Sequence, residues 1–318
     1  MEIKGTRVIV TGGAGFIGSH LTDKLVELGA HVTVIDNLSF GSKENINNEA
    51  NFLQVDVCDY LTMKDIISSF KPDLVFHLAA NATTKETSMG WSDPASDYLT
   101  NAGGTLNVLK AVADTSKNTH VIFTSSAAVY GEPEYVPIDE NHPTNPISPY
   151  GVSKLAGEKY CFAYFKELDI KTTILRIFNT YGPRQPRYVM FDLLKKLEKN
   201  PDQLEVIGTG EQVRDYCYVS DTVSAFILAA QKNGFGKIFN VAGGNPISIS
   251  DLSKLIIKSL GLSKRTSVYY TGKSWTGDIM RLSASITKIQ EALGFNPLVK
   301  LEDGILKLRD SVYPQSGS

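Results

Sequence analysis

A glycine-rich turn near the start of the chain constrains the fold more than any other feature. Residues 11–18 read TGGAGFIG and lie between the apolar run Val8-Ile9-Val10 and a helical pattern. A phosphate-binding turn needs a residue that tolerates unusual backbone angles, bare backbone N–H groups, and close packing of the helix on the strand. Gly12, Gly15 and Gly18 have the spacing to supply these. We interpret the segment as a dinucleotide-binding turn.

An acidic residue stands where such a site needs one. Asp36 closes the second predicted strand, residues 31–36, about 20 residues beyond the turn. Its carboxylate would accept hydrogen bonds from both hydroxyls of an adenosine ribose and would repel a 2′-phosphate, which favours NAD over NADP. The alternative is a turn or cap residue before Asn37. Asp56 and Val57, after the third predicted strand, could hold the adenine edge, although Asp56 alone could equally be a turn residue.

The order of apolar runs and amphipathic stretches predicts an α/β fold. Strands alternate with helices through the first half, which indicates a Rossmann doubly wound parallel sheet with helices on both faces. The rhythm breaks in the loop of residues 181–186, YGPRQP. We therefore expect residues 1–178 plus about 217–243 to form the NAD-binding domain. A smaller C-terminal α/β substrate domain would take about 179–216 and 244–318. The predicted strands of the first half are residues 8–11, 31–36, 52–55, 74–77, 120–124 and 172–176.

Composition excludes several classes. The 318 residues carry 32 Lys and Arg against 34 Asp and Glu, a balance that argues against nucleic-acid binding. No apolar run approaches the roughly 20 residues of a membrane span, and the N-terminus leads directly into a strand, so we expect no signal peptide. The three cysteines lack a Cys-x-x-Cys pair and no metal-ligand spacing occurs, so we expect a reduced, cytoplasmic protein without a metal.

Tyr150 and Lys154 lie at i and i+4 where a helix begins after Ser148-Pro149. This spacing places both on one helical face. A nearby ammonium and an oxidised nicotinamide would lower the pKa of the phenol, and the lysine could also bridge ribose hydroxyls. Ser126 stands just past a buried strand, where parallel sheets bind ligands, and could pass a substrate proton to Tyr150. The alternatives are an ordinary amphipathic helix and simple turn chemistry.

With these features together, the sequence resembles the extended short-chain dehydrogenase/reductase family, specifically its nucleotide-sugar 4-epimerases of the UDP-glucose type. The likeness spans nearly the whole chain. It implies that Ser126, Tyr150 and Lys154 are catalytic. It also implies a UDP-sugar substrate held by Ser126, Tyr150, Asn179, Val189, Val206, Arg214 and Asp278. The implied NAD contacts are Gly12, Gly15, Phe16, Ile17, Asp36, Asn37, Ser39, Gly41, Asp56, Val57, Leu78, Ala79, Ala80, Asn101, Thr124, Tyr150 and Lys154.

The resemblance also implies a mechanism. Tyr150 accepts the proton of the sugar O4 while the C4 hydride passes to NAD. The 4-keto sugar then rotates in the pocket, and the hydride returns to its opposite face. Dehydratase relatives carry Asp-Glu after the strand-end threonine, whereas Ser125-Ser126 follow Thr124 here, which disfavours dehydration. UDP-glucuronate decarboxylation or epimerisation and 4-keto reduction stay open, as does a non-catalytic NAD-binding regulator, although intact Ser126, Tyr150 and Lys154 argue against the last.

Some positions leave the substrate open. Trp275-Thr276-Gly277-Asp278 lacks the arginine that often precedes Gly-Asp in the family, and Arg281 is the possible substitute. Leu282, at the position resembling the gate against N-acetyl groups, leaves plain, acetylated and uronate sugars possible.

Three further expectations concern the partner of Arg214, the place of His77 and the assembly of the protein. Arg214 could bind diphosphate or pair with Asp215. His77 is expected to pack behind the site. The helices beginning near Tyr98 and Ser148 carry outward apolar residues, and the family often pairs these helices, so we expect a homodimer; the outward residues are Leu106, Ala156 and Phe162.

Overall fold

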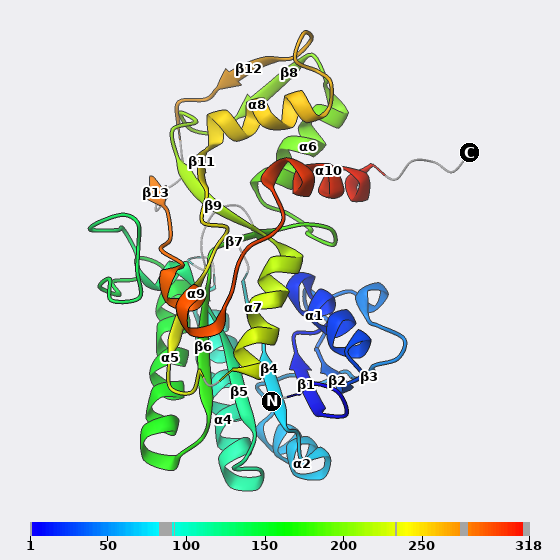
Figure 1. The fold of residues 1–318 in the computed structure, drawn as a ribbon, viewed down its shortest axis with the longest axis vertical. Coiled ribbons are helices and arrows are strands. Elements are labelled where there is room, and N and C mark those ends of the chain that lie inside the picture. The colour runs from blue at the N-terminus through cyan, green and yellow to red at the C-terminus, as the bar shows by residue number, and fades with distance from the viewer. Residues whose placement is uncertain (1, 83–90, 92, 233, 274–278, 314–318) are drawn as a thin grey trace.

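The computed structural model describes residues 2–82, 91, 93–232, 234–273 and 279–313. Its main sheet has seven strands, all parallel, in the order β10-β6-β5-β4-β1-β2-β3 (Figure 1). Read from β3, this is the strand order of a Rossmann fold, which confirms the predicted fold class. The strands are β1 (Arg7–Thr11), β2 (His31–Ile35), β3 (Asn51–Leu53), β4 (Leu74–His77), β5 (His120–Ser126), β6 (Thr172–Ile177) and β10 (Ile238–Val241).

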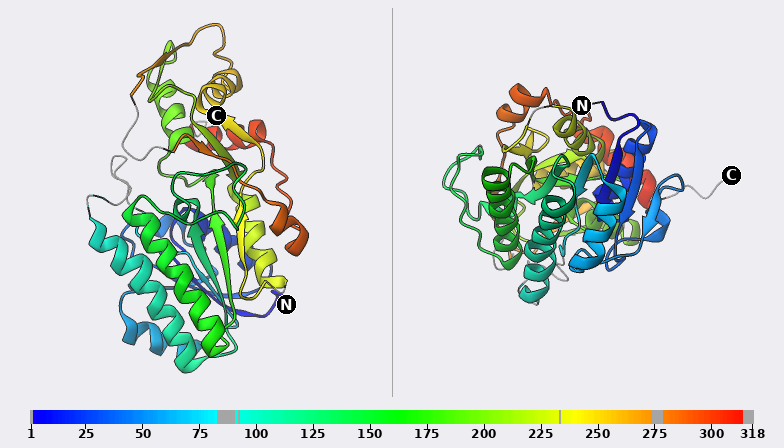
Figure 2. Two further views of the ribbon diagram at one scale, coloured as in Figure 1. Left: turned by 90° about the vertical axis from the view of Figure 1, so that its left-hand side faces the viewer. Right: turned by 90° about the horizontal axis from the view of Figure 1, so that it is seen from below.

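Alternation along the strands builds a core on each face of the sheet. Val8 and Val10 of β1 pack on one side and Ile9 on the other, because successive side chains of a strand point to opposite faces. The first core is closed by α1 (Phe16–Glu27), α7 (Val219–Gln231) and α9 (Thr287–Leu293). The second is closed by α2 (Tyr60–Phe70), α4 (Gly104–Thr115) and α5 (Pro149–Leu168), with α4 and α5 side by side (Figure 2).

The helix predicted from Tyr98 begins earlier than its sequence pattern suggested. Asp93 caps α3 (Pro94–Asp97) by accepting a hydrogen bond from the Ser96 N–H at 3.1 Å. A π-helical segment, η3 (Tyr98–Gly103), then joins α3 to α4. Such segments are rare and occur often at functional sites. Here η3 contacts α5.

A second group of elements forms its own core above the sheet (Figure 1). Strand β9 is the centre of a small mixed sheet, and β8 pairs in parallel with β12. The bounds are β7 (Asn179–Tyr181), α6 (Val189–Lys199), β8 (Gln203–Val206), β9 (Val213–Tyr218), β11 (Pro246–Ser248), α8 (Ile249–Ser259), β12 (Ser267–Tyr270), β13 (Arg281–Leu282) and α10 (Leu301–Val312).

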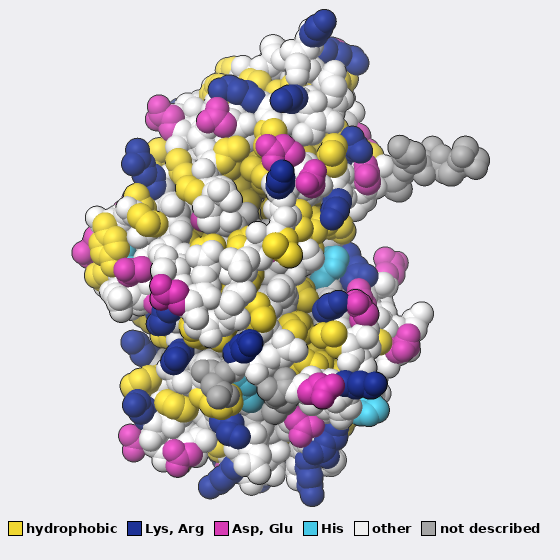
Figure 3. Space-filling view, viewed as in Figure 1, with side chains coloured by type: hydrophobic (Ala, Val, Ile, Leu, Met, Phe, Trp, Pro, Cys, Tyr) yellow, Lys and Arg dark blue, Asp and Glu magenta, His cyan; other side chains and the backbone are white. Residues whose placement is uncertain are grey.

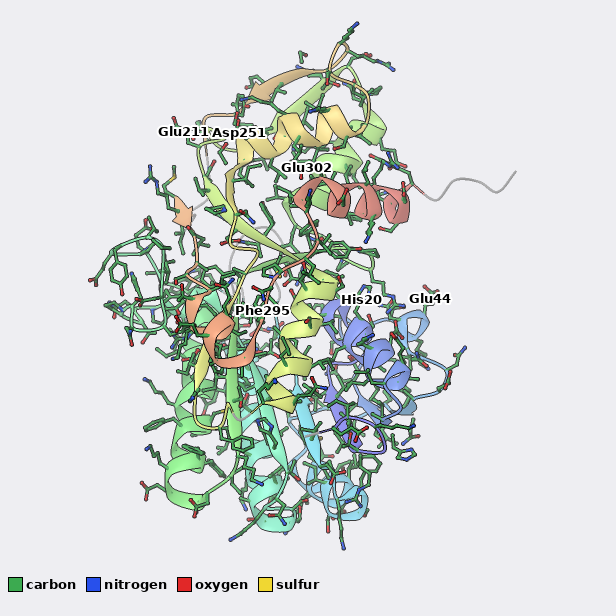
Figure 4. The ribbon with its side chains drawn as sticks, in the orientation of Figure 1. His20, Glu44, Glu211, Asp251, Phe295 and Glu302 are labelled. Carbon is green, nitrogen blue, oxygen red and sulfur yellow. The ribbon has the colours of Figure 1, made fainter. Side chains whose placement is uncertain are left out.

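One segment packs differently from its predicted assignment. Ile289, Leu293 and Phe295 are buried in the core shared by the main sheet and α7, although the sequence placed residues 244–318 in the second domain. Figure 4 shows Phe295 beside α9, near the lower part of the molecule. The chain returns here because α9 packs along β10 and supplies the apolar cover for that edge strand.

Polar contacts connect α1 with the loop after β7. The Nε2 atom of His20 lies 2.9 Å from the carbonyl oxygen of Pro183, and Arg184 forms an ion pair with Asp23 at 2.7 Å. His20 lies at the upper end of α1, facing the second group of elements (Figure 4).

Charges of both signs are mixed over the face shown in Figure 3. Among the described residues, no helix has the length and apolar character that a membrane crossing requires.

Candidate active site

The glycine-rich turn lies at the point where the strand order of the sheet reverses, between β1 and β4. Gly12 has φ +71°, and a Cβ there would lie 2.6 Å from the backbone nitrogen of Ala79. Only glycine therefore fits this position. The turn exposes the N-terminal end of α1, which favours a phosphate group. The structure thus brings Gly12 against the predicted cofactor segment of Leu78, Ala79 and Ala80.

Asp36 is buried beside the turn. Its carboxylate accepts hydrogen bonds from the backbone N–H groups of Ala14 at 3.0 Å and Leu38 at 2.8 Å. Burial raises the pKa of Asp36, and these two hydrogen bonds oppose that rise. Each carboxylate oxygen can accept a further hydrogen bond. Gly41 lies against this carboxylate, since a Cβ there would be 3.0 Å from Asp36 Oδ1.

The residues predicted around the adenine end lie in neighbouring loops. The Asn37 side chain donates to Asp56 at 2.9 Å and accepts from the Ser39 hydroxyl at 2.6 Å. Val57 is buried, and a Cβ on Gly104 would lie 2.6 Å from its side chain. Phe16 and Ile17 begin α1. The side chain of Ile17 packs against the core that α1 and α7 close, and the side chain of Phe16 packs against the core of the second group of elements. The loops that follow β2 and β3 are thus joined by the hydrogen bond between Asn37 and Asp56.

His77 packs behind the site, as the sequence predicted. Its Nδ1 lies 2.7 Å from the Thr11 hydroxyl and its Nε2 lies 3.0 Å from the Thr105 hydroxyl. Burial and, to a smaller extent, the positive charge of Lys154 lower the pKa of His77 to about 3. The ring is therefore neutral near pH 7 and connects β1, β4 and α4 through hydrogen bonds.

Ser126, Tyr150 and Lys154 meet at the carboxyl end of β5. Lys154 is 1% exposed, and its Nζ donates to the carbonyl oxygen of Thr124 at 2.9 Å. The same Nζ lies 5.9 Å from the centre of the Tyr150 ring. The Tyr150 hydroxyl lies close enough to Ser126 for that side chain to lower its pKa, and Ser126 Oγ accepts from the Ala128 N–H at 3.2 Å. Three side chains predicted from separate motifs therefore form one cluster.

The pKa of Tyr150 is high in the chain by itself. Burial raises it above its usual range, Tyr188 and Asp97 raise it further, and Ser126 and Arg187 lower it. Burial also lowers the pKa of Lys154 to about 8, against the influence of Asp97. Loss of solvation thus outweighs the charges around the ring, and the expected lowering of the phenol pKa depends on the oxidised nicotinamide as well as on Lys154.

A polar network beside the cluster includes Asn81 and Asp97, which were not predicted from the sequence. The Asn101 amide donates to the backbone carbonyl of Asn81 and to the Ser153 hydroxyl, both at 2.9 Å. The Asn81 amide in turn donates to Asp97 Oδ1 at 3.0 Å. The available signal was the spacing of Asp97 and Asn101, which lie four positions apart on one helical run.

The loop before α6 supplies two further residues that sequence reasoning missed. Arg187 and Tyr188 lie close enough to Tyr150 to affect its pKa. Arg187 is held by the backbone carbonyl of Ala82, and its guanidinium lies 5.3 Å from the centre of the Tyr188 ring. Tyr188 has φ +84°, which is an unusual backbone angle for a tyrosine and is typical of functional sites.

The predicted substrate residues lie in the second group of elements. Asn179 of β7 pairs with Tyr216 of β9, and Arg214 stands two positions before Tyr216. The Arg214 guanidinium donates to the carbonyl oxygens of Val213 at 2.9 Å and Ile279 at 2.7 Å. Val189 begins α6 and Val206 ends β8, where both belong to one apolar core. Asp278 lies outside the described residues.

The surroundings of Asp215 bear on the expectation that Arg214 forms an ion pair with it. Asp215 is buried and its carboxylate accepts from the backbone N–H of Ala284 at 3.4 Å. Burial raises its pKa to about 6, and backbone N–H groups near Gly244 oppose that rise. Its Oδ1 has no hydrogen-bond partner among the described residues, and adjacent strand residues point to opposite faces, so Arg214 and Asp215 do not face each other. Leu282 lies opposite Arg214 in the ladder, and Arg281 is exposed.

Two observations test whether these residues fit a dinucleotide. The turn at Gly12 leaves no room for a side chain, and so presents bare backbone N–H groups. Thr124 Oγ1 is buried beside Lys154 without a hydrogen-bond partner among the described residues. Buried hydroxyls are almost always paired, so a group from outside the chain is expected to satisfy it. The donor set fits NAD.

Comparison with known proteins agrees with this geometry. A sequence profile of the NAD dependent epimerase/dehydratase family matches residues 8–242. The crystal structure of UDP-glucose 4-epimerase with UDP-glucose from Thermotoga maritima has a TM-score of 0.89 and 37% identity, covering 97% of this chain and 99% of that one. The UDP-glucose 4-epimerase of Mycolicibacterium smegmatis is 33% identical, covering 95% of this chain and 96% of that protein. UDP-glucuronic acid decarboxylase 1 of Xenopus tropicalis is also 33% identical, over 95% of this chain and 70% of its own length.

The fold and the site therefore define an NAD-dependent enzyme built on a Rossmann sheet. The chain belongs to the NAD dependent epimerase/dehydratase family, and within it is an isomerase of the epimerase type.

Proposed function

We propose that this enzyme interconverts the two C4 epimers of a UDP-sugar and returns its NAD unchanged. The observation that carries the proposal is the cluster of Ser126, Tyr150 and Lys154 at the carboxyl end of β5, beside the glycine-rich turn. The similar proteins that are named UDP-glucose 4-epimerase support the reaction. Asn179 and Arg214 support a substrate that carries a diphosphate, since a guanidinium binds phosphate oxygens in pairs.

Each residue of the cluster has a role that its environment supports. NAD, when bound, would supply the oxidising power at C4 by accepting a hydride and would return that hydride to the 4-keto sugar. Tyr150 exchanges the proton of the sugar O4, and Ser126 orients that hydroxyl. Lys154, held by Thr124, places a positive charge near the phenol. The positive charge of the oxidised nicotinamide is needed to bring the pKa of Tyr150 down, because the chain alone leaves it high.

The sugar itself is the open part of the proposal. Glucose and galactose are the first candidates because of the proteins that this chain resembles. Arg187 favours a second candidate, a UDP-hexuronate, because this guanidinium lies close enough to Tyr150 to lower its pKa. A cation at the sugar end of the site would complement a C6 carboxylate. The sequence left an N-acetyl sugar open as well.

One experiment separates the alternatives. The purified protein is incubated with UDP-galactose, UDP-N-acetylgalactosamine and UDP-glucuronate in turn, without added NADH, and the products are resolved by chromatography. We expect epimer formation with no net change in NADH. Release of carbon dioxide from UDP-glucuronate would instead identify a decarboxylase. A protein that keeps NAD bound but converts none of the three would contradict the proposal and favour a regulator.

We also propose that the enzyme is a homodimer joined through α4 and α5. These two adjacent helices and the segments before them expose Tyr98, Leu99, Val152 and Phe162. A hollow of about 440 Å³ lies at their upper end, lined by Trp91, Pro94, Tyr98, Ile147, Val152 and Ala156 among others. Exposed apolar patches of this kind mark interaction sites. Light scattering during gel filtration should give twice the chain mass, and Val152→Glu should give the single mass.

The cysteines support a reducing location such as the cytoplasm. Cys58, Cys161 and Cys217 are all free, and the last two are buried. Free buried thiols are typical of proteins kept in a reducing compartment.

A further inference from the structure

Asp97 is the last residue of α3 and lies inside the polar network next to the catalytic helix. It is 1% exposed, and its Oδ1 accepts from the Asn81 amide at 3.0 Å. Asn81 is connected in turn to Asn101, whose amide donates to Ser153, the neighbour of Lys154 on α5. All five of these side chains are buried. Asp97 is therefore the acidic member of a buried hydrogen-bond network that ends at Ser153, the sequence neighbour of Lys154.

The second oxygen of this carboxylate has no role in the fold. Asp97 Oδ2 is buried and has no hydrogen-bond partner among the described residues. A buried carboxylate with a vacant oxygen is destabilising unless a positive charge compensates it. An ordinary packing position would be better filled by an apolar or an amide side chain. The vacant oxygen therefore indicates a role for the charge itself.

Lys154 is the cation that acts on Asp97, although burial and the charge of Asp93 raise the pKa of Asp97 to about 6, which leaves it ionised near pH 7. Lys154 is equally buried, and no carboxylate among the described residues lies within 4 Å of its Nζ. Asp97 is nevertheless the acidic residue whose charge acts most on that ammonium, and Lys154 acts on Asp97 in return. Helix α3 packs against α5, which places the two residues in adjacent elements.

We propose that Asp97 is a positioning residue whose buried negative charge keeps Lys154 in its ammonium form and thereby sets the pH range in which Tyr150 can exchange a proton. This inference rests on the proposed function for its catalytic consequence. The coupling between the two charges does not depend on the substrate. It can therefore be tested separately.

The groups that face this pair come from several elements. Asp93 lies on the same short helix as Asp97, Tyr150 and Cys161 lie on α5 with Lys154, and the neutral His77 lies on β4. From the second group of elements, Arg187 and Tyr188 face Tyr150. Asp97 is the acidic residue of this set that acts on both Tyr150 and Lys154.

The signs of the effects follow from Coulomb interactions. Burial brings the pKa of Lys154 down to about 8, and Asp97 holds it up. Asp97 also raises the pKa of Tyr150. Removal of this negative charge should lower both pKa values. If the phenolate sets the acidic limb of the activity profile and the ammonium sets the basic limb, both limbs should move to lower pH.

The test compares Asp97→Asn with a matched control, Asp93→Asn. Both variants remove one negative charge from α3, and asparagine keeps the Oδ1 acceptor at position 97 and the helix cap at position 93. Asp93 is exposed, and its charge raises the pKa of Asp97 but is not among the charges that act on Lys154 or Tyr150, so its removal leaves Asp97 ionised. We expect both limbs of the kcat/KM profile to move about 0.5–1 pH unit lower in Asp97→Asn. The profile of Asp93→Asn should match the wild type.

A readout besides activity follows Lys154 directly. Lysine labelled with carbon-13 at Cε is titrated by NMR in the protein without substrate, and the Lys154 signal is identified by its absence in Lys154→Met. The pKa of Lys154 should be lower in Asp97→Asn than in wild type. It should be restored in Asp97→Glu, which keeps the charge and covers the case that the asparagine variant does not fold.

The outcomes separate this inference from the proposed function. An unchanged Lys154 titration in Asp97→Asn would overturn the inference, whatever the enzyme converts. Loss of NAD without any change in that titration would also overturn it, because Asp97 would then bind the cofactor directly. A wild-type enzyme that converts no UDP-sugar would refute the proposed function alone, and the NMR titration would still decide the coupling.

Discussion

The cofactor end and the substrate end of this active site are built in different ways. At the cofactor end, backbone N–H groups hold the loops in place. Gly12 N–H donates to the Ile35 carbonyl, Leu78 N–H donates to the Thr11 carbonyl, and Ala14 N–H donates to the Asp36 carboxylate. At the substrate end, the central strand β9 is flanked by strands of only two or three residues that come from separate parts of the chain. The first end is fixed by main-chain geometry and the second by side chains on short strands.

This difference suggests which properties of the enzyme can vary. Backbone positions at the carboxyl ends of parallel strands are held by the whole sheet, so the chemistry that depends on them is hard to change. Side chains on short strands can be exchanged at a smaller cost in stability. The reaction type should therefore be more robust than the choice of sugar. The predictions below test this contrast, beginning with the largest expected effect.

The two ion pairs of the structure that involve β6 and the loop after β7 should differ greatly in importance. Arg176 and Glu158 are buried and share two hydrogen bonds of 2.8 and 2.7 Å. Arg176→Met leaves a buried carboxylate without its partner, and should lower the free energy of unfolding by about 3 kcal/mol or more. Arg184→Met removes the more exposed partner of Asp23 and should cost less than about 1 kcal/mol. Urea denaturation measures both, and similar losses would remove the contrast between the two regions.

Tyr150→Phe should reduce turnover by at least about 100-fold while NAD stays bound. The substitution keeps the ring and removes only the hydroxyl that exchanges the proton. Tyr160→Phe, on the same helix but on the core side, is the control and should retain near-normal turnover. Steady-state rates with the best substrate, together with the absorbance of bound NAD, measure both properties. Near-normal turnover of Tyr150→Phe would rule out its role as acid and base.

Gly12→Ala should weaken NAD binding by about 30-fold, equivalent to about 2 kcal/mol. The added Cβ would lie 2.6 Å from Ala79 N, at a backbone angle of φ +71° that alanine avoids. Gly272→Ala is the matched control, since its φ is +69° but nothing lies within 4 Å of the added atom. It should carry only the conformational cost and leave NAD affinity unchanged. Isothermal titration with NAD distinguishes the two, and equal losses would show that the close approach to Ala79 is unimportant.

Arg214→Lys should raise KM about 10-fold and leave kcat nearly unchanged. A lysine keeps the charge but loses the paired geometry with phosphate oxygens, and it cannot donate to both Val213 and Ile279 in the same way. A change confined to KM indicates binding that is equal in the ground state and the transition state. Arg265→Lys, in an exposed ion pair with Asp202, is the control. A fall in kcat instead would place Arg214 near the reacting atoms.

Much of the cofactor end could be predicted from the sequence because its signals are local. Gly12, Asp36 and the i, i+4 pair of Tyr150 and Lys154 are each recognised from a few neighbouring residues, and the structure brings them to one edge of the sheet. The substrate end was less predictable. Strands as short as β11 and β13 leave no periodic pattern, and their pairing with β9 depends on contacts between distant segments.

The sequence by itself determined the parallel α/β order and the glycine-rich turn, and it predicted Ser126, Tyr150 and Lys154 as a cluster, because each signal depends on the spacing of residues along a single strand, turn or helix. Only the tertiary structure packed the helix that carries Asp97 against α5, paired Glu158 with Arg176, and packed Phe295 into the core of the sheet. These depend on which distant segments become neighbours and lose contact with water together. Burial and charge coupling are properties of that packing, and they set the pKa values on which the chemistry depends.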